Sequence, residues 1–260
     1  VATTIAINGG NNQSATVNTN VATAPSVLIT DQYANPVSGT SVTFAIGSGG
    51  GSLTGGAATS NASGIATVGS WKLGTASGAN TLTATSTGLT GSPLTFTATA
   101  TPGSAATLSL TAPGSATAGS AFSVTVTALD SYGNTATGYS GTVHFSGGGS
   151  GSPTLPGDYT FTGGDAGAHT FTNGFSLKQA GSRTITATDT LTGTITGNTS
   201  LTINPAGAAT LSLTAPGSAT AGSSFSATVT ALDSFGNTAT GYTGTVHFTG
   251  GGTGATLPAD

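Results

Sequence analysis

The stretch Asp130-Ser-Tyr-Gly-Asn-Thr-Ala-Thr-Gly138 returns as Asp233-Ser-Phe-Gly-Asn-Thr-Ala-Thr-Gly241, and in looser form as Asp31-Gln-Tyr-Ala-Asn-Pro-Val-Ser-Gly39. Each copy lies between two short runs in which apolar and polar residues alternate. Asp and Asn side chains bond to nearby backbone amides, and Gly accepts positive φ, so the stretch predicts a turn between two β-strands. The copies lie about one domain apart, which predicts a tandem array.

The composition indicates a folded all-β chain. Of the 260 residues, 35% are hydrophobic and only 4% are charged, whereas disordered chains of low hydrophobicity usually carry high charge. Apolar residues do not recur at helical spacing over three turns anywhere in the sequence. Abundant Gly, Ser and Thr suit turns and the solvent-facing positions of strands. The composition therefore predicts an all-β fold. The strands located below number about seven in each hundred residues, which is the count expected of an immunoglobulin-like sandwich, so the fold class predicted is tandem immunoglobulin-like β-sandwiches arranged end to end.

Charge and residue usage exclude several classes of function. The net charge is −4 and no basic cluster exists, so nucleic acid has nothing to bind. No apolar run approaches the ~20 residues that span a bilayer. The chain has no Cys, which excludes disulfides and thiol chemistry. It opens on Val1 with no charged segment, so we expect any signal peptide to lie outside it or to have been removed. Hydroxyl-rich, nearly uncharged β repeats favour an extracellular location.

Two complete units and part of a third are predicted, with joints at Pro102-Gly103 and Asn204-Pro205-Ala206-Gly207. The predicted domains are residues 1–103, 104–206 and 207–260. In the first, strands are expected at 3–8, 15–18, 27–30, 41–46, 64–73, 80–86 and 93–100, with a glycine-rich loop at 47–56. In the second, they are expected at 107–111, 121–129, 141–146, 158–162, 169–178, 182–188 and 194–203.

The third unit begins as a near-duplicate of the second. Residues 208–253 repeat residues 105–150 with six differences over 46 positions, which indicates recent duplication of a whole domain. Asp260 corresponds to Asp158, about halfway through the unit. Half a sandwich leaves a core face and strand edges uncovered. We therefore expect that residues 1–260 belong to a longer repetitive chain, or that another chain completes the last unit.

The first unit resembles a bacterial immunoglobulin-like domain of the group found in intimin- and invasin-type surface proteins. The stretches that carry this resemblance are Gly10–Thr16, Val27–Asp31, Asn35–Gly39 with Val42–Phe44, and Gly64–Val68 with Trp71. The second and third units resemble the same superfamily more loosely, and Asp130–Asn134, Gly157–Phe161 and Gly167–Phe171 also resemble filamin-like repeats. The resemblance implies a secreted or surface-anchored stalk, fibre or adhesin whose repeats act as spacers. It implies no catalytic residues.

Histidine and aspartate are the first candidates for site residues. His144 and His247 occupy the same place in Thr-Val-His-Phe, where Val and Phe take the inward face, so both His side chains are expected to face solvent. His169 is interpreted as a half-buried packing residue, with a ligand role as the alternative. Asp158, Asp165 and Asp189 are expected to cap turns. The alternative is a calcium site that would depend on backbone carbonyls, because no Asp-x-Asp-x-Asp run exists.

The remaining candidates carry little chemistry. Trp71 is expected to pack in the core or at a domain joint, with a sugar-stacking platform as the alternative. Lys72 and Lys178 occupy comparable positions, but an isopeptide bond would need a buried acid beside each lysine. The glycine clusters at 49–51 and 147–149 lack the Lys-Ser/Thr and the helix of a phosphate loop. We predict no catalytic residue, no metal site and no cofactor, because no motif orients a base by an acid.

The function predicted is that of a semi-rigid extracellular spacer in a bacterial stalk, fibre or adhesin-type protein. The expected partners are other copies of the chain or its own continuation, with a surface glycan or host ligand bound through other modules. Two alternatives remain: a carbohydrate- or ligand-binding module, and an accessory domain of a large secreted enzyme.

Overall fold

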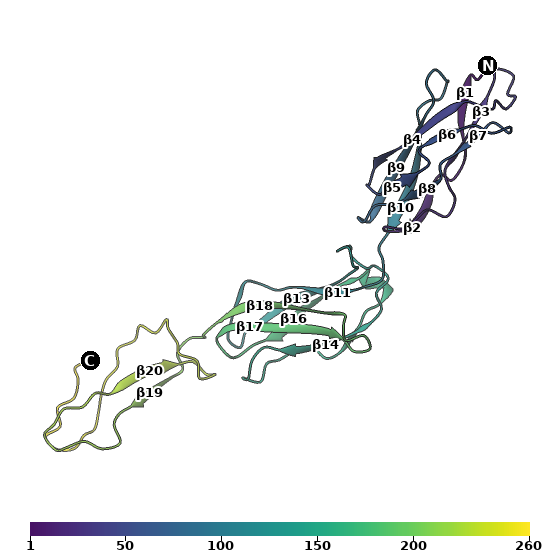
Figure 1. Ribbon diagram of the computed structural model, residues 1–260. Helices are drawn as coiled ribbons and strands as arrows, with labels where there is room; N and C mark the ends of the chain where they lie inside the picture. The colour runs from purple at the N-terminus through teal and green to yellow at the C-terminus, as the bar shows by residue number, and fades with distance from the viewer.

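A computed structural model describes the whole chain, residues 1–260, and consists almost entirely of β-strands. Residues 1–103, 104–206 and 207–260 are called the first, second and third units below. The three units follow one another in a row, with the two termini at opposite ends of the molecule (Figure 1). The structure contains no long apolar helix of the kind that crosses a lipid bilayer.

The first unit is a β-sandwich. Its three-stranded sheet has the order β1 (Thr4–Gly9), β3 (Ser26–Thr30), β7 (Ile65–Thr67). Its five-stranded sheet has the order β2 (Gln13–Thr16), β10 (Leu94–Thr101), β9 (Gly78–Thr85), β4 (Ser41–Ser48), β6 (Ala57–Thr59). A third pair joins β5 (Ser52–Thr54) to β8 (Ser70–Lys72). Side chains of both larger sheets meet in one core of 16 buried residues.

The second unit repeats this topology. Its smaller sheet has the order β11 (Thr107–Thr111), β13 (Ala121–Leu129), β16 (Ala168–Ser176). Its larger sheet has the order β12 (Ser115–Thr117), β18 (Thr196–Asn204), β17 (Gly181–Asp189), β14 (Thr142–Gly147), β15 (Tyr159–Thr160). One short 3₁₀ helix, η1 (Gly163–Asp165), precedes β16. The core of this unit holds 19 buried residues.

Alternation along each strand determines which side chains enter the core. In β13, the residues Phe122, Val124, Val126 and Ala128 are buried, while the intervening residues are partly exposed. The neighbouring strand β16 adds aromatic side chains to the same layer: Phe122 stacks on its cross-strand partner Phe175 at a centroid distance of 5.9 Å. A shift of one residue would turn this whole set toward solvent, so the register of β13 is strongly specified. The predicted all-β fold of end-to-end immunoglobulin-like sandwiches is confirmed.

One short strand in each sandwich pairs in parallel with the last strand of its unit. Strand β2 pairs with β10, and β12 pairs with β18 through Ser115–Thr202, Ala116–Ile203 and Thr117–Asn204. The sequence did not predict β12, because a strand of three residues has too little alternation to be recognised.

Three predicted elements are wrong in detail. Residues 64–73 are two strands, because the Gly69 amide donates to the Thr54 carbonyl at 2.9 Å and sends β8 to pair with β5 instead of β3. The loop predicted at 47–56 therefore contains β5. The strand predicted at 158–162 is limited to β15, because the chain turns into η1 directly after Thr162, which is the N-cap residue of that helix.

The third unit contains only two strands, β19 (Thr210–Thr214) and β20 (Thr228–Leu232), which pair with each other. Several of its large apolar side chains lie open to solvent, as expected for part of a sandwich. Leu211, Leu213 and Phe225 are 46%, 60% and 60% exposed, whereas the corresponding Leu108, Leu110 and Phe122 are 5%, 8% and 6% exposed.

Candidate functional site: the joints between units

The repeated Asp-x-x-x-Asn stretch forms the same hydrogen-bonded turn in each copy. In the second unit, Asp130 Oδ1 accepts the backbone amides of Tyr132 and Asn134, both at 2.9 Å. The Asp130 amide donates to the Asn134 carbonyl at 2.8 Å, which closes the turn between β13 and the following segment. The predicted turn and its mechanism are confirmed.

Asp130 also binds the linker that enters the second unit. Its Oδ2 accepts the Gly103 amide at 2.9 Å and the Asn134 side-chain amide at 2.9 Å. Burial alone would raise the pKa of Asp130, but these hydrogen bonds, with Asn134 contributing most, lower it to about 2. The carboxylate is therefore held in its charged form by the turn and the linker together.

The Asn134 side chain reaches back to the first unit. Its Nδ2 donates to the Thr75 carbonyl at 2.8 Å, and its Oδ1 accepts the Ser77 amide at 2.8 Å. The Asn amide thus bonds to one carbonyl and one amide of a single loop, as a neighbouring strand would. Asn134 therefore joins the turn to the preceding unit, while Asp130 joins the turn to the linker.

The joint between the second and third units repeats these contacts. Asp233 Oδ2 accepts the Ala206 amide at 3.0 Å and the Asn237 side-chain amide at 2.8 Å. Asn237 Nδ2 donates to the Lys178 carbonyl at 2.7 Å, and its Oδ1 accepts the Ala180 amide at 2.8 Å. Since the same bonds occur twice, with loops of different sequence, they define a general joint.

The aromatic residue of the turn differs between the joints, and so does the residue that it meets. Tyr132 Oη is hydrogen-bonded to Asn18 Nδ2 at 2.5 Å. Phe235 instead lies directly over Gly119, where an added Cβ would be 2.3 Å from the ring. Asn18 and Gly119 are equivalent: each has positive φ and follows the residue that bonds to the end of its unit's last strand. The Tyr-to-Phe difference is therefore matched by an Asn-to-Gly difference in the preceding unit.

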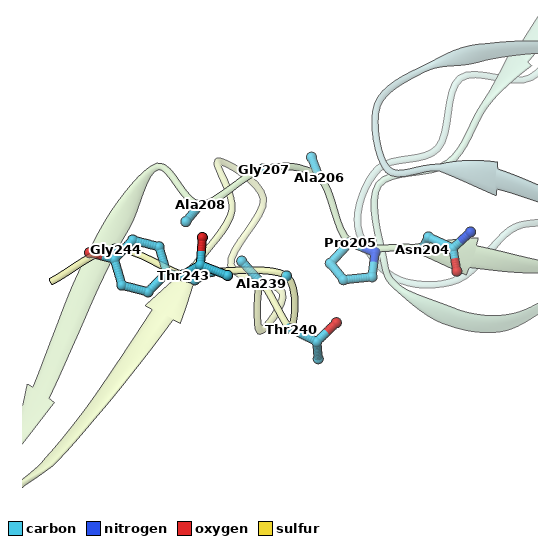
Figure 2. A pocket seen from close by; sticks show the side chains of 11 residues that line it. Asn204, Pro205, Ala206, Gly207, Ala208, Ala239, Thr240, Thr243 and Gly244 are labelled. Carbon is cyan, nitrogen blue, oxygen red and sulfur yellow. The ribbon is translucent and has the colours of Figure 1, made fainter.

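A shallow cleft lies beside each linker. At the second joint it has a volume of about 710 Å³ and is lined by linker residues 204–208 and loop residues 239–244 (Figure 2). The side chains of Pro205, Thr240 and Thr243 border it, and none of its lining residues is charged. At the first joint the cleft is about 510 Å³, and its one charged residue, Asp189, is bonded to Tyr139 Oη at 2.5 Å. Neither cleft offers a free charged group to a ligand.

The predicted positions of His144 and His247 are confirmed. Both side chains are well exposed, at 61% and 69%, and each ring lies against an aspartate. His144 Nδ1 is 2.7 Å from Asp158 Oδ1, and His247 Nδ1 is 2.6 Å from Asp260 Oδ1. The Asp158 carboxylate therefore binds a histidine ring. The expectation that Asp158 caps a turn is wrong, because its carboxylate points toward β14, the strand that carries His144.

His169 is half-buried, as interpreted from the sequence, and belongs to an aromatic cluster. Its ring stacks on Tyr159 at a centroid distance of 3.9 Å, and its Nδ1 is 2.7 Å from Asp165 Oδ1. Asp165 also caps η1 by accepting the Thr162 amide at 2.7 Å. That amide bond and the His169 ring lower the pKa of Asp165 well below its usual range. The cluster packs the edge of the second sandwich.

The other candidate residues have structural positions. Asp189 caps a turn by accepting the amides of Leu191 and Thr192 at 2.9 and 2.7 Å. Trp71 is fully buried in the first core, so its ring does not form a sugar-stacking platform. Lys72 and Lys178 are only partly buried, and the ion pairs of the molecule all join His to Asp. No group of three or more His, Cys, Asp or Glu residues is placed to hold a metal ion.

Solved structures are similar to this chain, although no family model and no curated protein sequence matches it. FdeC, described as a broadly conserved Escherichia coli adhesin, is 20% identical with a TM-score of 0.52, over 92% of this chain and 75% of that chain. The Yersinia pseudotuberculosis adhesin InvE is 20% identical, with a TM-score of 0.37 over 77% of this chain and 58% of that chain. Invasin, described as a bacterial integrin-binding protein, is 19% identical, with a TM-score of 0.41 over 93% of this chain and 48% of that chain.

At this level of identity, the similarity to FdeC establishes the fold. The chain has the architecture of tandem immunoglobulin-like β-sandwiches. This fold agrees with the resemblance found in the sequence of the first unit.

Proposed function

We propose that the chain is a spacer segment of a bacterial surface protein, a stalk, fibre or adhesin, with domains at residues 1–103, 104–206 and 207–260. The observation that carries this proposal is the joint itself. Asn134 and Asn237 make the same paired bonds to the preceding unit, at 2.7–2.8 Å in both places. A joint that fixes the angle between units turns a string of domains into a semi-rigid rod. Pro102 and Pro205 in the linkers further restrict bending.

The similarity to FdeC supports the extracellular setting, because that protein is itself described as an adhesin. An adhesive ligand, whether a surface glycan or a host protein, would be bound by other modules. We propose no catalytic residue and no cofactor. The absence of a catalytic residue is supported by the sparse charge of the chain. It is also supported by the pairing of every histidine with an aspartate.

Small-angle X-ray scattering on the full chain tests the spacer role. The expected result is the maximum dimension and narrow distance distribution of three units held in a row. The variants Asn134→Ala and Asn237→Ala should broaden that distribution, because each removes the paired bonds of one joint. Ser131→Ala, in the same turn but outside these bonds, is the matched control. A distribution that is equally broad in the native chain and in both variants contradicts the proposal.

We further propose that the chain associates with other copies of itself. Soluble domains usually keep about 25–35% of their surface charged, whereas this whole chain has ten charged Lys, Arg and Asp side chains. Few cationic residues are available to protect the strand edges, and the third unit exposes Leu211, Leu213 and Phe225. Glycan on the Ser and Thr surface is the competing way for such a chain to stay soluble.

Sedimentation of the unglycosylated chain over a concentration series tests self-association. We expect the mean mass to rise with concentration, and the rise to weaken in Leu213→Ser, since that change removes an exposed apolar side chain. Ser212→Thr, on the same strand, changes little apolar area and is the matched control. A single monomeric species at high concentration rules out assembly through these surfaces.

A further inference from the structure

The first unit carries a third copy of the turn, with the same hydrogen bonds inside it. Asp31 Oδ1 accepts the amides of Tyr33 and Asn35 at 2.8 and 2.9 Å, as in the other copies. The Asn35 side chain donates to Asp31 Oδ2 at 3.1 Å and makes no other hydrogen bond. The internal geometry of the turn is thus complete, while the groups that form a joint elsewhere are free.

Three groups at this turn match those used at the two observed joints. Asn35 has a free Oδ1 and a free amide hydrogen, which Asn134 uses for the Ser77 amide and the Thr75 carbonyl. Asp31 Oδ2 accepts only the Asn35 side-chain amide, whereas Asp130 Oδ2 also accepts the linker amide of Gly103. The Tyr33 side chain is 76% exposed, whereas Tyr132 in the joint is 47% exposed.

We propose that the Asp31–Asn35 turn is the receiving half of a third joint, and that its partner is the distal end of a preceding immunoglobulin-like unit. That end presents a carbonyl and an amide two residues apart on one loop, as Thr75 and Ser77 do. This inference rests on the proposed spacer function and names the surface through which the spacer extends toward its N-terminal side.

The aromatic residue indicates which kind of unit fits. At the joints described above, Tyr meets Asn and Phe meets Gly. Tyr33 carries a hydroxyl, so the preceding unit should present Asn at the position of Asn18. A unit with Gly at that position, like Gly119 of the second unit, would leave the Tyr33 hydroxyl without its partner.

A chain with one added copy of the first unit tests the inference. Residues 1–106 are placed directly before Thr4–Asp260, so that Ala106 is followed by Thr4. This junction is in register, because Thr107 pairs with Leu129 just before Asp130, and Thr4 pairs with Thr30 just before Asp31. The added Gly103 amide then lies where Asp31 can accept it. The added copy has the sequence of a unit already present in the chain, so its folding introduces no new requirement.

Hydrogen exchange of the Ser77 amide in the added copy is the measurement. We expect this amide to be as protected as the original Ser77, which Asn134 holds in the same molecule. Asn35→Ala in the original copy, whose turn contacts the added copy, should speed exchange of the added Ser77 amide about tenfold and leave the original Ser77 unchanged. A loss of about 1.4 kcal/mol corresponds to that factor. Asn18→Gly in the added copy should also speed exchange of the added Ser77 amide. Combining it with Tyr33→Phe in the original copy should restore the protection of that amide.

Three outcomes have distinct meanings. If the added Ser77 exchanges equally fast with Asn35 and with Ala at position 35, the inference is overturned. If the original Ser77 and Ala180 amides are unprotected as well, the spacer proposal itself fails. Asn35→Ala could instead dissociate oligomers of the 1–260 chain and leave exchange of the added Ser77 amide unchanged. In that case the turn binds a second copy of the chain in trans, and the proposed occupant is wrong.

Discussion

The second and third units start with nearly the same 46 residues and reach different structures. In the second, Leu108, Leu110 and Phe122 are buried in a core of 19 residues. In the third, Leu211, Leu213 and Phe225 occupy the corresponding places on two strands and remain exposed. The joint, in contrast, is the same in both: Asp130 and Asp233 are buried, with equivalent hydrogen bonds.

This difference separates two kinds of information in the repeat. The turn, the linker and the end of the preceding unit are enough to form a joint. The core also needs β16, which completes the sheet of β11 and β13, and β17 and β18, which belong to the facing sheet; all three come later in the chain than the turn. Local chemistry therefore sets how units connect, and distant strands decide whether a unit closes.

Completing the third unit should produce the largest effect. When Tyr159–Pro205 is appended after Asp260, we expect Leu211, Leu213 and Phe225 to become buried. Burial of each such side chain contributes roughly 1.5–3 kcal/mol, so the amides of β19 should become strongly protected from hydrogen exchange. Appending the same segment with Phe175→Asp is the control, because Phe175 is the residue that stacks on Phe122. Equal protection with both segments would contradict the comparison.

The same substitution in the two units should have very different costs. Phe122→Ala should destabilise the second unit by about 3–5 kcal/mol, since it empties part of a packed core. Phe225→Ala should change stability by less than about 0.5 kcal/mol, as expected for an exposed site. Urea unfolding of each full-length variant measures both values. A similar loss in the two variants would mean that Phe225 is packed in solution.

Acid should weaken the joint before it disrupts the cores. Folding lowers the pKa of Asp130 from 3.8 to about 2, so this group stabilises the folded state above about pH 4 and loses that contribution as the pH falls toward 2. A shift of this size corresponds to about 2 kcal/mol. Urea unfolding of the second unit between pH 5 and pH 2 measures the loss, and Asp130→Asn should show a flatter profile. The proposal about Asp130 is wrong if both proteins lose stability in parallel.

Exchange of the aromatic residues should have the smallest effect and test the pairing rule. Tyr132→Phe removes the bond to Asn18 and should cost about 0.5–1 kcal/mol, because the group is partly exposed. Phe235→Tyr should be nearly neutral, since Gly119 offers no side chain to its hydroxyl. Thermal unfolding measures both changes. A larger loss for Phe235→Tyr than for Tyr132→Phe would contradict the matched pairs.

The sequence predicted the fold because alternation is a local signal. The ranges predicted for β11 and β13 agree with the structure residue for residue. The division of residues 64–73 into two strands was missed, because it depends on the Thr54 carbonyl, ten or more residues away. The strand β12 was missed because three residues give no periodicity.

The joint could not be predicted, although its turn could. Asn134 bonds to backbone atoms of Thr75 and Ser77. Because every residue has these backbone groups, the residue types at positions 75 and 77 do not reveal the contact. The signal that did exist was paired: Tyr132 and Phe235 differ together with Asn18 and Gly119. Because those positions are about a hundred residues apart, the sequence alone gave no reason to compare them.

The parallel pairing of β12 with β18 has a mechanical consequence. The chain enters the second unit upstream of β12 and leaves it from the end of β18, at opposite ends of the sandwich (Figure 1). Tension along the molecule therefore pulls these two strands in opposite directions along their length. The hydrogen bonds between β12 and β18 are then loaded together in shear and are not opened one by one. Strands β2 and β10 are placed in the same way in the first unit. Each sandwich is arranged to resist stretching along the long axis of the molecule.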